Sequence, residues 1–388
     1  MNRLTESSHG SWRWLTGSAL GAEVEFLEAR GREAELAMNR KERRASAKQN
    51  RSGAGAAGKV EQAIAFAQAG EFDKAEPLLD AARKIAPKDP EMLHQLGMLY
   101  VRTGRSDAGI EMLKQAVDAR PQEYIYWNNL AAAYLSVERS KEAVEAARKT
   151  VALNPGYAMA WQNLAFGQRD FGDHAAAAEA FAQADKTGVM EPTSLASWGE
   201  SLGLTGRLEE GEKTVRRALV REQDDAAILT LLGWLLVEQK KDDEARETFK
   251  RSLELKPNQF LAAFNYGVLL LRVKETDAAL RWLRRATSID PKSVSAWRVL
   301  ATELDRHGLK DEALPAAERA LRMAPDDEVV KKLIAQIKGE PRSADTTEVI
   351  DFAAPQPLAP SPEAAKMEKA ASQPGEANIF DFSTINIG

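Results

Sequence analysis

Apolar residues along most of this chain recur at spacings of three and four, the pattern of helices that turn one face toward a core. The segment Trp127 to Pro155, WNNLAAAYLSVERSKEAVEAARKTVALNP, contains two such stretches separated by a polar turn. The proline at its end cannot continue a helix, because it lacks the N–H group and its ring clashes with the preceding turn. The segment therefore predicts two helices joined by a short turn.

The unit repeats every 34 residues, without insertion or deletion, from residue 56 to residue 327. In steps of 34, one position holds only small residues: Gly97, Ala131, Ala165, Gly199, Gly233, Gly267 and Ala301. Proline closes most units, at Pro87, Pro121, Pro155, Pro257, Pro291 and Pro325. A small residue at a helix crossing lets two axes approach closely. One hairpin cannot bury its apolar face alone, so neighbouring hairpins are expected to stack.

The repeated pattern resembles the tetratricopeptide repeat (TPR) family, whose unit has a large apolar residue, then Leu with Gly or Ala, a tyrosine-like position, two alanines and a proline. The resemblance implies an all-α solenoid, or superhelix, of about eight antiparallel hairpins over residues 56–327. Residues 328–339, EVVKKLIAQIKG, form one further amphipathic stretch, expected to be a capping helix. The predicted TPR domain is therefore 56–339.

The junction after the fourth repeat departs from the pattern. Proline is absent from the closing positions Val189 and Gln223, and Gly188 and Pro192 stand nearby. We expect a bend or a softer seam near Gly188 that separates repeats one to four from repeats five to eight. Ordinary drift within a repeat family is the alternative explanation.

Both flanks are expected to lack a packed core. Residues 340–388 are rich in Pro, Ala, Ser and acidic residues, which predicts a disordered acidic tail. Two short stretches in it read apolar, apolar, Asp, Phe, and their anchors are Ile350, Phe352, Phe380 and Phe382. They are interpreted as docking motifs, for a partner or for this protein's own groove, or as a chance likeness.

Residues 1–55 are predicted to be a flexible, locally basic N-terminal region. The run MNRKERRASAKQNR begins at Met38, and one hypothesis is that the protein starts at this methionine. The basic run is either a solvated lead-in to the first helix or an electrostatic contact for acidic lipid, nucleic acid or an acidic partner.

Composition narrows the class of protein. The chain has 58 Asp plus Glu against 53 Lys plus Arg, so no global basic excess favours nucleic acid as a partner. Cysteine is absent, which excludes disulfides, thiolate metal sites and a cysteine nucleophile. No run of about 18 apolar residues predicts a transmembrane segment, and the N-terminus is a poor secretory signal. We therefore expect a cytoplasmic protein.

No catalytic, cofactor-binding or metal-binding constellation is predicted. The segment from Gly53 to Val60 has the glycine and lysine spacing of a phosphate-binding loop, but Val60 replaces the magnesium-binding hydroxyl and no strand precedes it. The histidines lie far apart in the sequence, without metal-ligand neighbours: His9, His94, His174 and His307. The sequence predicts that the chain is not an enzyme.

The TPR resemblance implies that the first helix of each hairpin lines a concave groove. One groove position holds asparagine in three of seven repeats, Asn129, Asn163 and Asn265, similar to the asparagine ladder of O-linked N-acetylglucosamine transferase. Such side chains can bond the backbone of an extended peptide. The candidate partner-binding residues are His94, Gln95, Met98, Arg102, Asn129, Gln162, Asn163, Phe166, Trp234, Asn265 and Arg272. The tryptophans at the first packing position are assigned to the core: Trp127, Trp161 and Trp297.

These observations favour a scaffold or adaptor that binds a protein or peptide in the concave groove. The alternatives are a regulatory or substrate-recruiting subunit of an enzyme on another chain, and an assembly factor that self-associates through its tail or the solenoid ends. Asn129→Ala combined with Asn163→Ala is expected to weaken partner binding while leaving the melting temperature nearly unchanged.

Overall fold

The computed structural model describes residues 4–6, 12–14 and 55–339, and this part of the chain is almost entirely helical. The all-α repeat architecture predicted from the sequence is confirmed. Two strands, β1 (Leu4–Glu6) and β2 (Trp12–Trp14), form an antiparallel pair that was not predicted, because three-residue strands are too short to show an alternating pattern. Met38, its basic run and the tail motifs lie outside the described residues.

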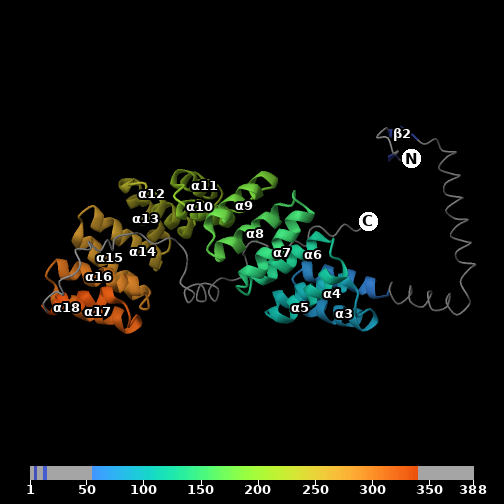
Figure 1. Cartoon of the computed structure of the whole chain (residues 1–388), viewed down its shortest axis with the longest axis horizontal. Helices are drawn as coiled ribbons and strands as arrows, with labels where there is room; N and C mark the ends of the chain where they lie inside the picture. Colours follow the sequence, from blue (N-terminus) through green and yellow to red (C-terminus); the bar gives the residue numbers. More distant parts are fainter. Residues whose placement is uncertain (1–3, 7–11, 15–54, 340–388) are drawn as a thin grey trace, which may run out of the picture. The chain divides into compact units, whose positions relative to one another are not determined.

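The chain divides into two compact units, residues 1–120 and 121–388. The helices of the first unit are residues 55–68, α3 (Phe72–Ile85), α4 (Pro90–Arg102) and α5 (Ser106–Ala119). Those of the second (Figure 1) are α6 (Tyr124–Leu135), α7 (Ser140–Leu153), α8 (Ala158–Asp170), α9 (His174–Thr187), α10 (Pro192–Leu204), α11 (Leu208–Arg221), α12 (Ala226–Glu238), α13 (Asp242–Leu255), α14 (Phe260–Arg272), α15 (Thr276–Ile289), α16 (Val294–Arg306), α17 (Lys310–Met323) and α18 (Glu328–Lys338).

The division into two units falls between Arg120 and Pro121 and not near Gly188. The bend or softer seam expected near Gly188 stays a prediction. Helices α9 and α10 pack against each other within the second unit. The turn between them is held by Arg221, whose Nη1 donates to the carbonyl oxygen of Met190 at 2.5 Å and whose Nη2 lies 3.2 Å from a carboxylate oxygen of Glu191. An arginine from the next hairpin thus stabilises a turn that lacks the usual proline.

The turn inside each hairpin uses one left-handed residue at a fixed place in the repeat. Glycine provides it in five repeats, as at Gly104, where φ is 81°. The other three repeats place Glu138, Lys240 and Lys274 there, with φ of 61°, 60° and 62°. A non-glycine residue in this region is strained. The tertiary packing of each hairpin therefore fixes the turn even where the local sequence does not favour it.

The closing turn of each repeat is fixed by a side-chain donor. Trp127, Trp161 and Trp297 each donate Nε1–H to the carbonyl oxygen of the proline six residues earlier, at 2.8–3.0 Å. Where the repeat lacks the tryptophan, an arginine replaces it: Arg251 donates to the carbonyl oxygen of Gln223, and Arg285 to that of Pro257. All three tryptophans are half-buried, so their assignment to the core was wrong; each bridges the surface of its hairpin to the turn.

The helix after the last hairpin, α18, packs against α17 and buries Val330, Leu333 and Ile337. Asp327 caps its start by accepting hydrogen bonds from the backbone N–H groups of residues 329 and 330. Gly339 ends it in the left-handed conformation, with φ of 77°.

Candidate partner-binding face

The first helices of neighbouring hairpins pack directly on one another in the second unit: α6 on α8, α8 on α10, α10 on α12 and α12 on α14. Each second helix of this unit packs mainly on the first helices that precede and follow it in the chain. Successive first helices contact each other more than successive second helices do, so the first helices form the inner side of the stack. Their shared surface is the candidate partner-binding face.

The predicted asparagines lie at this face, but their side chains are buried. Asn129 is 0% exposed, Asn163 is 2% exposed and Asn265 is 1% exposed. Asn163 Nδ2 donates to Asn128 Oδ1 at 2.9 Å, across the boundary between the third and fourth repeats, and Asn128 Nδ2 donates to Asn129 Oδ1 at 3.3 Å. The prediction that these side chains are exposed was wrong, because the first helices pack closely enough to cover them.

Asn163→Ala is therefore expected to lower the free energy of unfolding by about 1–2 kcal/mol, because it leaves buried Asn128 Oδ1 without its donor. This replaces the expectation of an unchanged melting temperature. The measurement is urea unfolding of the full chain, followed by circular dichroism. Asn258→Ala, at an exposed position in the turn after α13, is the control and should differ little from the wild type. Equal losses in both variants would contradict the assigned role of the buried pair.

Other predicted residues of the second unit remain partly exposed on α8. Gln162 is half-buried and accepts a hydrogen bond from Ser194 Oγ at 2.8 Å. Phe166 is half-buried too; its ring meets that of Phe181 edge-on, with centroids 5.2 Å apart. Arg169, which sequence reasoning did not select, lies over the Phe166 ring at 5.2 Å. These side chains form a mixed apolar and polar surface on α8.

Trp234 and Arg272 are structural elements of the stack. Trp234 on α12 is 5% exposed, and its indole lies against Gly203 of α10, where an added Cβ would be 2.6 Å from Trp234 Cζ3. Arg272 Nη1 donates to the carbonyl oxygen of Val237 at 2.8 Å, and its Nη2 pairs with Asp242. Whether these residues also contact a partner stays a proposal.

Four predicted residues, His94, Gln95, Met98 and Arg102, belong to α4 in the first unit. The first three are buried, and Gln95 Nε2 donates to Glu91 Oε1 at 2.8 Å. Arg102 is exposed and lies over the ring of Phe72, 4.8 Å from its centroid. They are described apart from the residues of the second unit. The tail anchors Ile350, Phe352, Phe380 and Phe382 lie outside the described residues.

Sequence reasoning missed Glu200 on α10. Its side chain is buried, and its Oε1 has no hydrogen-bond partner. Burial raises the pKa of Glu200 above its ordinary value; nearby Arg169 lowers the pKa and Asp170 raises it, both by less. Because the folded-state pKa is raised, the ionised carboxylate destabilises the fold above that pKa, and the penalty disappears below the unfolded-state pKa. The 34-residue period could have identified this residue, since Glu200 is the only ionisable side chain at its repeat position.

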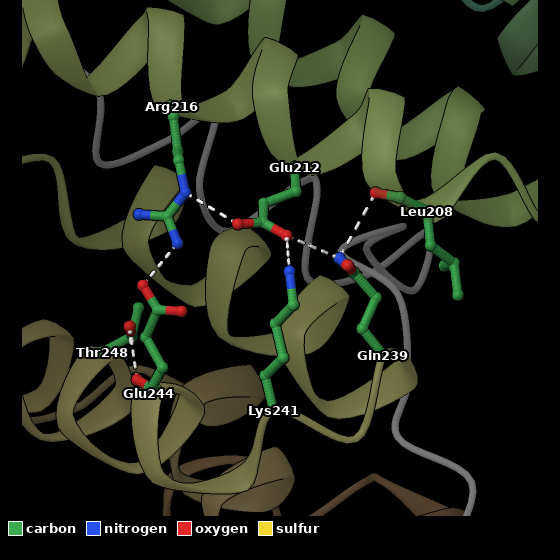
Figure 2. A network of polar contacts seen from close by, with 7 residues as sticks. All are labelled: Leu208, Glu212, Arg216, Gln239, Lys241, Glu244 and Thr248. Carbon is green, nitrogen blue, oxygen red and sulfur yellow. Dashed lines mark hydrogen bonds and ion pairs between the residues drawn. The ribbon is translucent and has the colours of Figure 1, made fainter.

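Glu212 on α11 is a half-buried carboxylate whose two oxygens both have hydrogen-bond donors (Figure 2). Arg216 Nε donates to its Oε1 at 2.8 Å, while Gln239 Nε2 and Lys241 Nζ donate to its Oε2 at 2.9 and 2.7 Å. Burial raises the pKa of Glu212, but these three donors together outweigh burial and hold the pKa below its ordinary value. Arg216 also pairs with Glu244 of α13. The network ties the fifth hairpin to the sixth.

Two further findings concern residues 4–6, 12–14 and 55–339. No helix there combines the length and the apolar character needed to span a lipid bilayer. Nor does this part of the chain gather three or more His, Asp or Glu side chains in an arrangement that could hold a metal ion.

Hairpins of fixed length, small residues at each crossing and an inner face of first helices define a tetratricopeptide-repeat protein, a class that generally binds other proteins and has no catalytic activity. The family model described as the cilia and flagella-associated protein 70 C-terminal domain matches residues 16–265, more than half of the chain. The chain therefore belongs to this family of tetratricopeptide-repeat domains.

Individual relatives match only parts of the chain. Tetratricopeptide repeat-containing protein trd-1 of Caenorhabditis elegans is 34% identical over 91 residues, which is 24% of this chain and 12% of that protein. Small glutamine-rich tetratricopeptide repeat-containing protein 2 of Mycosarcoma maydis is 28% identical over 110 residues, 28% of this chain and 31% of that protein. The chain thus spans less than a third of either relative.

Among solved structures, a chain from the crystal structure of the APC/C hetero-tetramer Cut9–Hcn1 is similar to this one. The match covers 69% of this chain and 52% of that chain, with a TM-score of 0.52 and 17% sequence identity. At this identity the likeness concerns the fold alone.

Proposed function

We propose that this protein is a non-catalytic scaffold that binds an extended segment of a partner protein along the first helices of its second unit. The observation that carries the proposal is a set of half-buried side chains on α6, α8 and α10, here called the strip: apolar Ile125, Met159 and Phe166 with polar Gln162 and Ser197. Apolar side chains that remain partly exposed beside polar groups are the usual composition of a peptide-binding surface.

Hydrogen bonds between successive first helices, within and beneath this strip, support the proposal. Asn128, Asn163 and the pair Gln162–Ser194 join successive first helices, so the surface is rigid before a partner arrives. A preorganised surface loses less conformational entropy on binding. The cytoplasmic location, and self-association through the tail or the solenoid ends, stay proposals from the sequence.

Met159→Glu is expected to abolish partner capture, because it places a charge in the middle of the apolar part of the strip, where a bound segment would desolvate it. The experiment captures partners on the immobilised full chain and quantifies them by mass spectrometry. Val220→Glu on α11 is the matched control: the same substitution at a side chain that is 77% exposed on a second helix. Proteins retained by the wild type and by Val220→Glu, but lost from Met159→Glu, would support the proposal. Equal recovery by both variants would contradict it.

A further inference from the structure

Glu200 is an unusual residue for a helical repeat, because it is a buried carboxylate with no donor for one of its oxygens. The side chain is 9% exposed, and Oε1 accepts no hydrogen bond within the part of the chain that the structure describes. A buried charge is normally paired, since an unpaired one loses its hydration without a compensating interaction. Buried polar groups without partners are rare in native proteins and call for an explanation.

Arg169, the cation that lowers the pKa of Glu200, does not pair with it. Arg169 Nη2 lies 2.7 Å from Asp170 Oδ1, and its Nη1 donates to Ser197 Oγ at 2.8 Å. Its guanidinium group also lies over the ring of Phe166. Arg169 is therefore held by other partners, and it acts on Glu200 only through the electrostatic attraction that lowers the pKa of this carboxyl group.

The position of Glu200 in the repeat places it on the inner side. It stands 34 residues after Phe166 and 34 residues before Trp234, so the three residues occupy the same site on α8, α10 and α12. Gly203, one turn further along α10, lets the Trp234 indole lie against that helix. An aromatic side chain thus occupies the matching position on each side of the carboxylate. Carboxylates and aromatic faces are both groups that attract cations.

We propose that Glu200 is the contact for a basic side chain, lysine or arginine, of the extended segment that occupies this inner face. The inference rests on the proposed function and adds the chemistry of the partner. A basic side chain would supply the donor that Oε1 lacks. Glu212 and Glu303 differ from Glu200 because each already has a donor within the protein. Gln239 Nε2 donates to Glu212 Oε2, and Arg306 Nη1 donates to Glu303 Oε1 at 2.5 Å.

The test uses degenerate nonapeptide libraries whose central residue is fixed as lysine, arginine, norleucine or glutamate. Each library is passed over the immobilised full chain, and retained peptides are quantified by mass spectrometry. The wild type is expected to retain the lysine and arginine libraries about tenfold more than the norleucine library. Glu200→Gln should lose this preference. Glu303→Gln, a buried glutamate on the first helix α16 that already has a partner, should keep it.

The melting temperature of Glu200→Gln shows whether Glu200 serves binding or supports the fold. Glu200→Gln should melt at or above the wild-type temperature near neutral pH, with a difference that shrinks toward about pH 4, because it removes an unfavourable buried charge. A lower melting temperature for Glu200→Gln would overturn the inference by showing that the carboxylate supports the fold. Peptide retention without a basic preference would overturn it while leaving the proposed function standing. Retention of no peptide by the wild type would overturn both.

Discussion

Phe249→Ala is expected to lower the free energy of unfolding by about 3–5 kcal/mol, the range for removing a fully buried aromatic side chain. Phe249 on α13 is 0% exposed, and its ring fills the space beside Gly233 of α12. It also faces the ring of Tyr266 on α14, with centroids 6.2 Å apart. One side chain therefore holds the sixth hairpin together and joins it to the seventh, and its loss leaves a cavity at both contacts.

Denaturant unfolding of the full chain measures the loss, and amide hydrogen exchange shows where it falls. Stacked repeats contact only their neighbours, so exchange should rise first in α12, α13 and α14. Val220→Ala, at an exposed position on α11, is the control and should change stability by less than about 0.5 kcal/mol. A loss below about 1 kcal/mol for Phe249→Ala would show that the neighbouring helices collapse into the space.

The role of Phe249 illustrates what the repeat pattern predicts and what it leaves open. The period identified a small residue at every helix crossing, and glycine at position 233 follows from it. The pattern did not say what occupies the space that the small residue leaves. At Gly233 it is an aromatic ring, whereas at Gly97 it is Leu113 Cγ together with the carbonyl oxygen of Gly109, 2.8 and 2.9 Å from an added Cβ. The two sites look alike in sequence because glycine, which has no Cβ, is required at both.

The period predicted which helices carry the candidate residues, but not whether their side chains are exposed. The period placed Asn129 and Asn163 correctly on first helices, and these helices do form the inner side of the second unit. Exposure depends on how closely successive first helices approach, which is decided by contacts between repeats. A single-repeat pattern carries no information on that distance. For the same reason, Asn128 was overlooked, although it supplies the oxygen that bonds Asn163.

The burial of these asparagines also changes where recognition is expected. A buried, mutually bonded amide has few free donors for a peptide backbone. Recognition therefore shifts to partly exposed neighbours such as Met159 and Phe166, and to Glu200, whose carboxylate lacks a donor. The asparagines act beneath that surface by fixing the spacing of the helices. We therefore expect substitutions of the buried asparagines to lower stability, and substitutions of Met159, Phe166 or Glu200 to change partner binding.

Gly109→Val is expected to lower the free energy of unfolding of the first unit by about 3 kcal/mol, the upper end of the range for overpacking. An added Cβ on Gly109 would lie 2.6 Å from the carbonyl oxygen of Gly97 and 2.6 Å from Val101 Cγ2. A backbone oxygen cannot rotate away as a side chain can, so α4 and α5 would have to separate. Separation would expose Leu96 and Leu113, which are both fully buried at this crossing.

Gly58→Val is the matched control for Gly109→Val, because it makes the same substitution in a helix of the same unit where an added Cβ meets nothing within 4 Å. Valine is slightly better than glycine inside a helix, so this variant should be unchanged or more stable by about 0.5 kcal/mol. Hydrogen exchange of residues 90–119, measured on the full chain, reports the difference directly. Equal protection in the two variants would mean that α4 and α5 do not pack backbone to backbone, and that glycine at position 109 serves only the local helix.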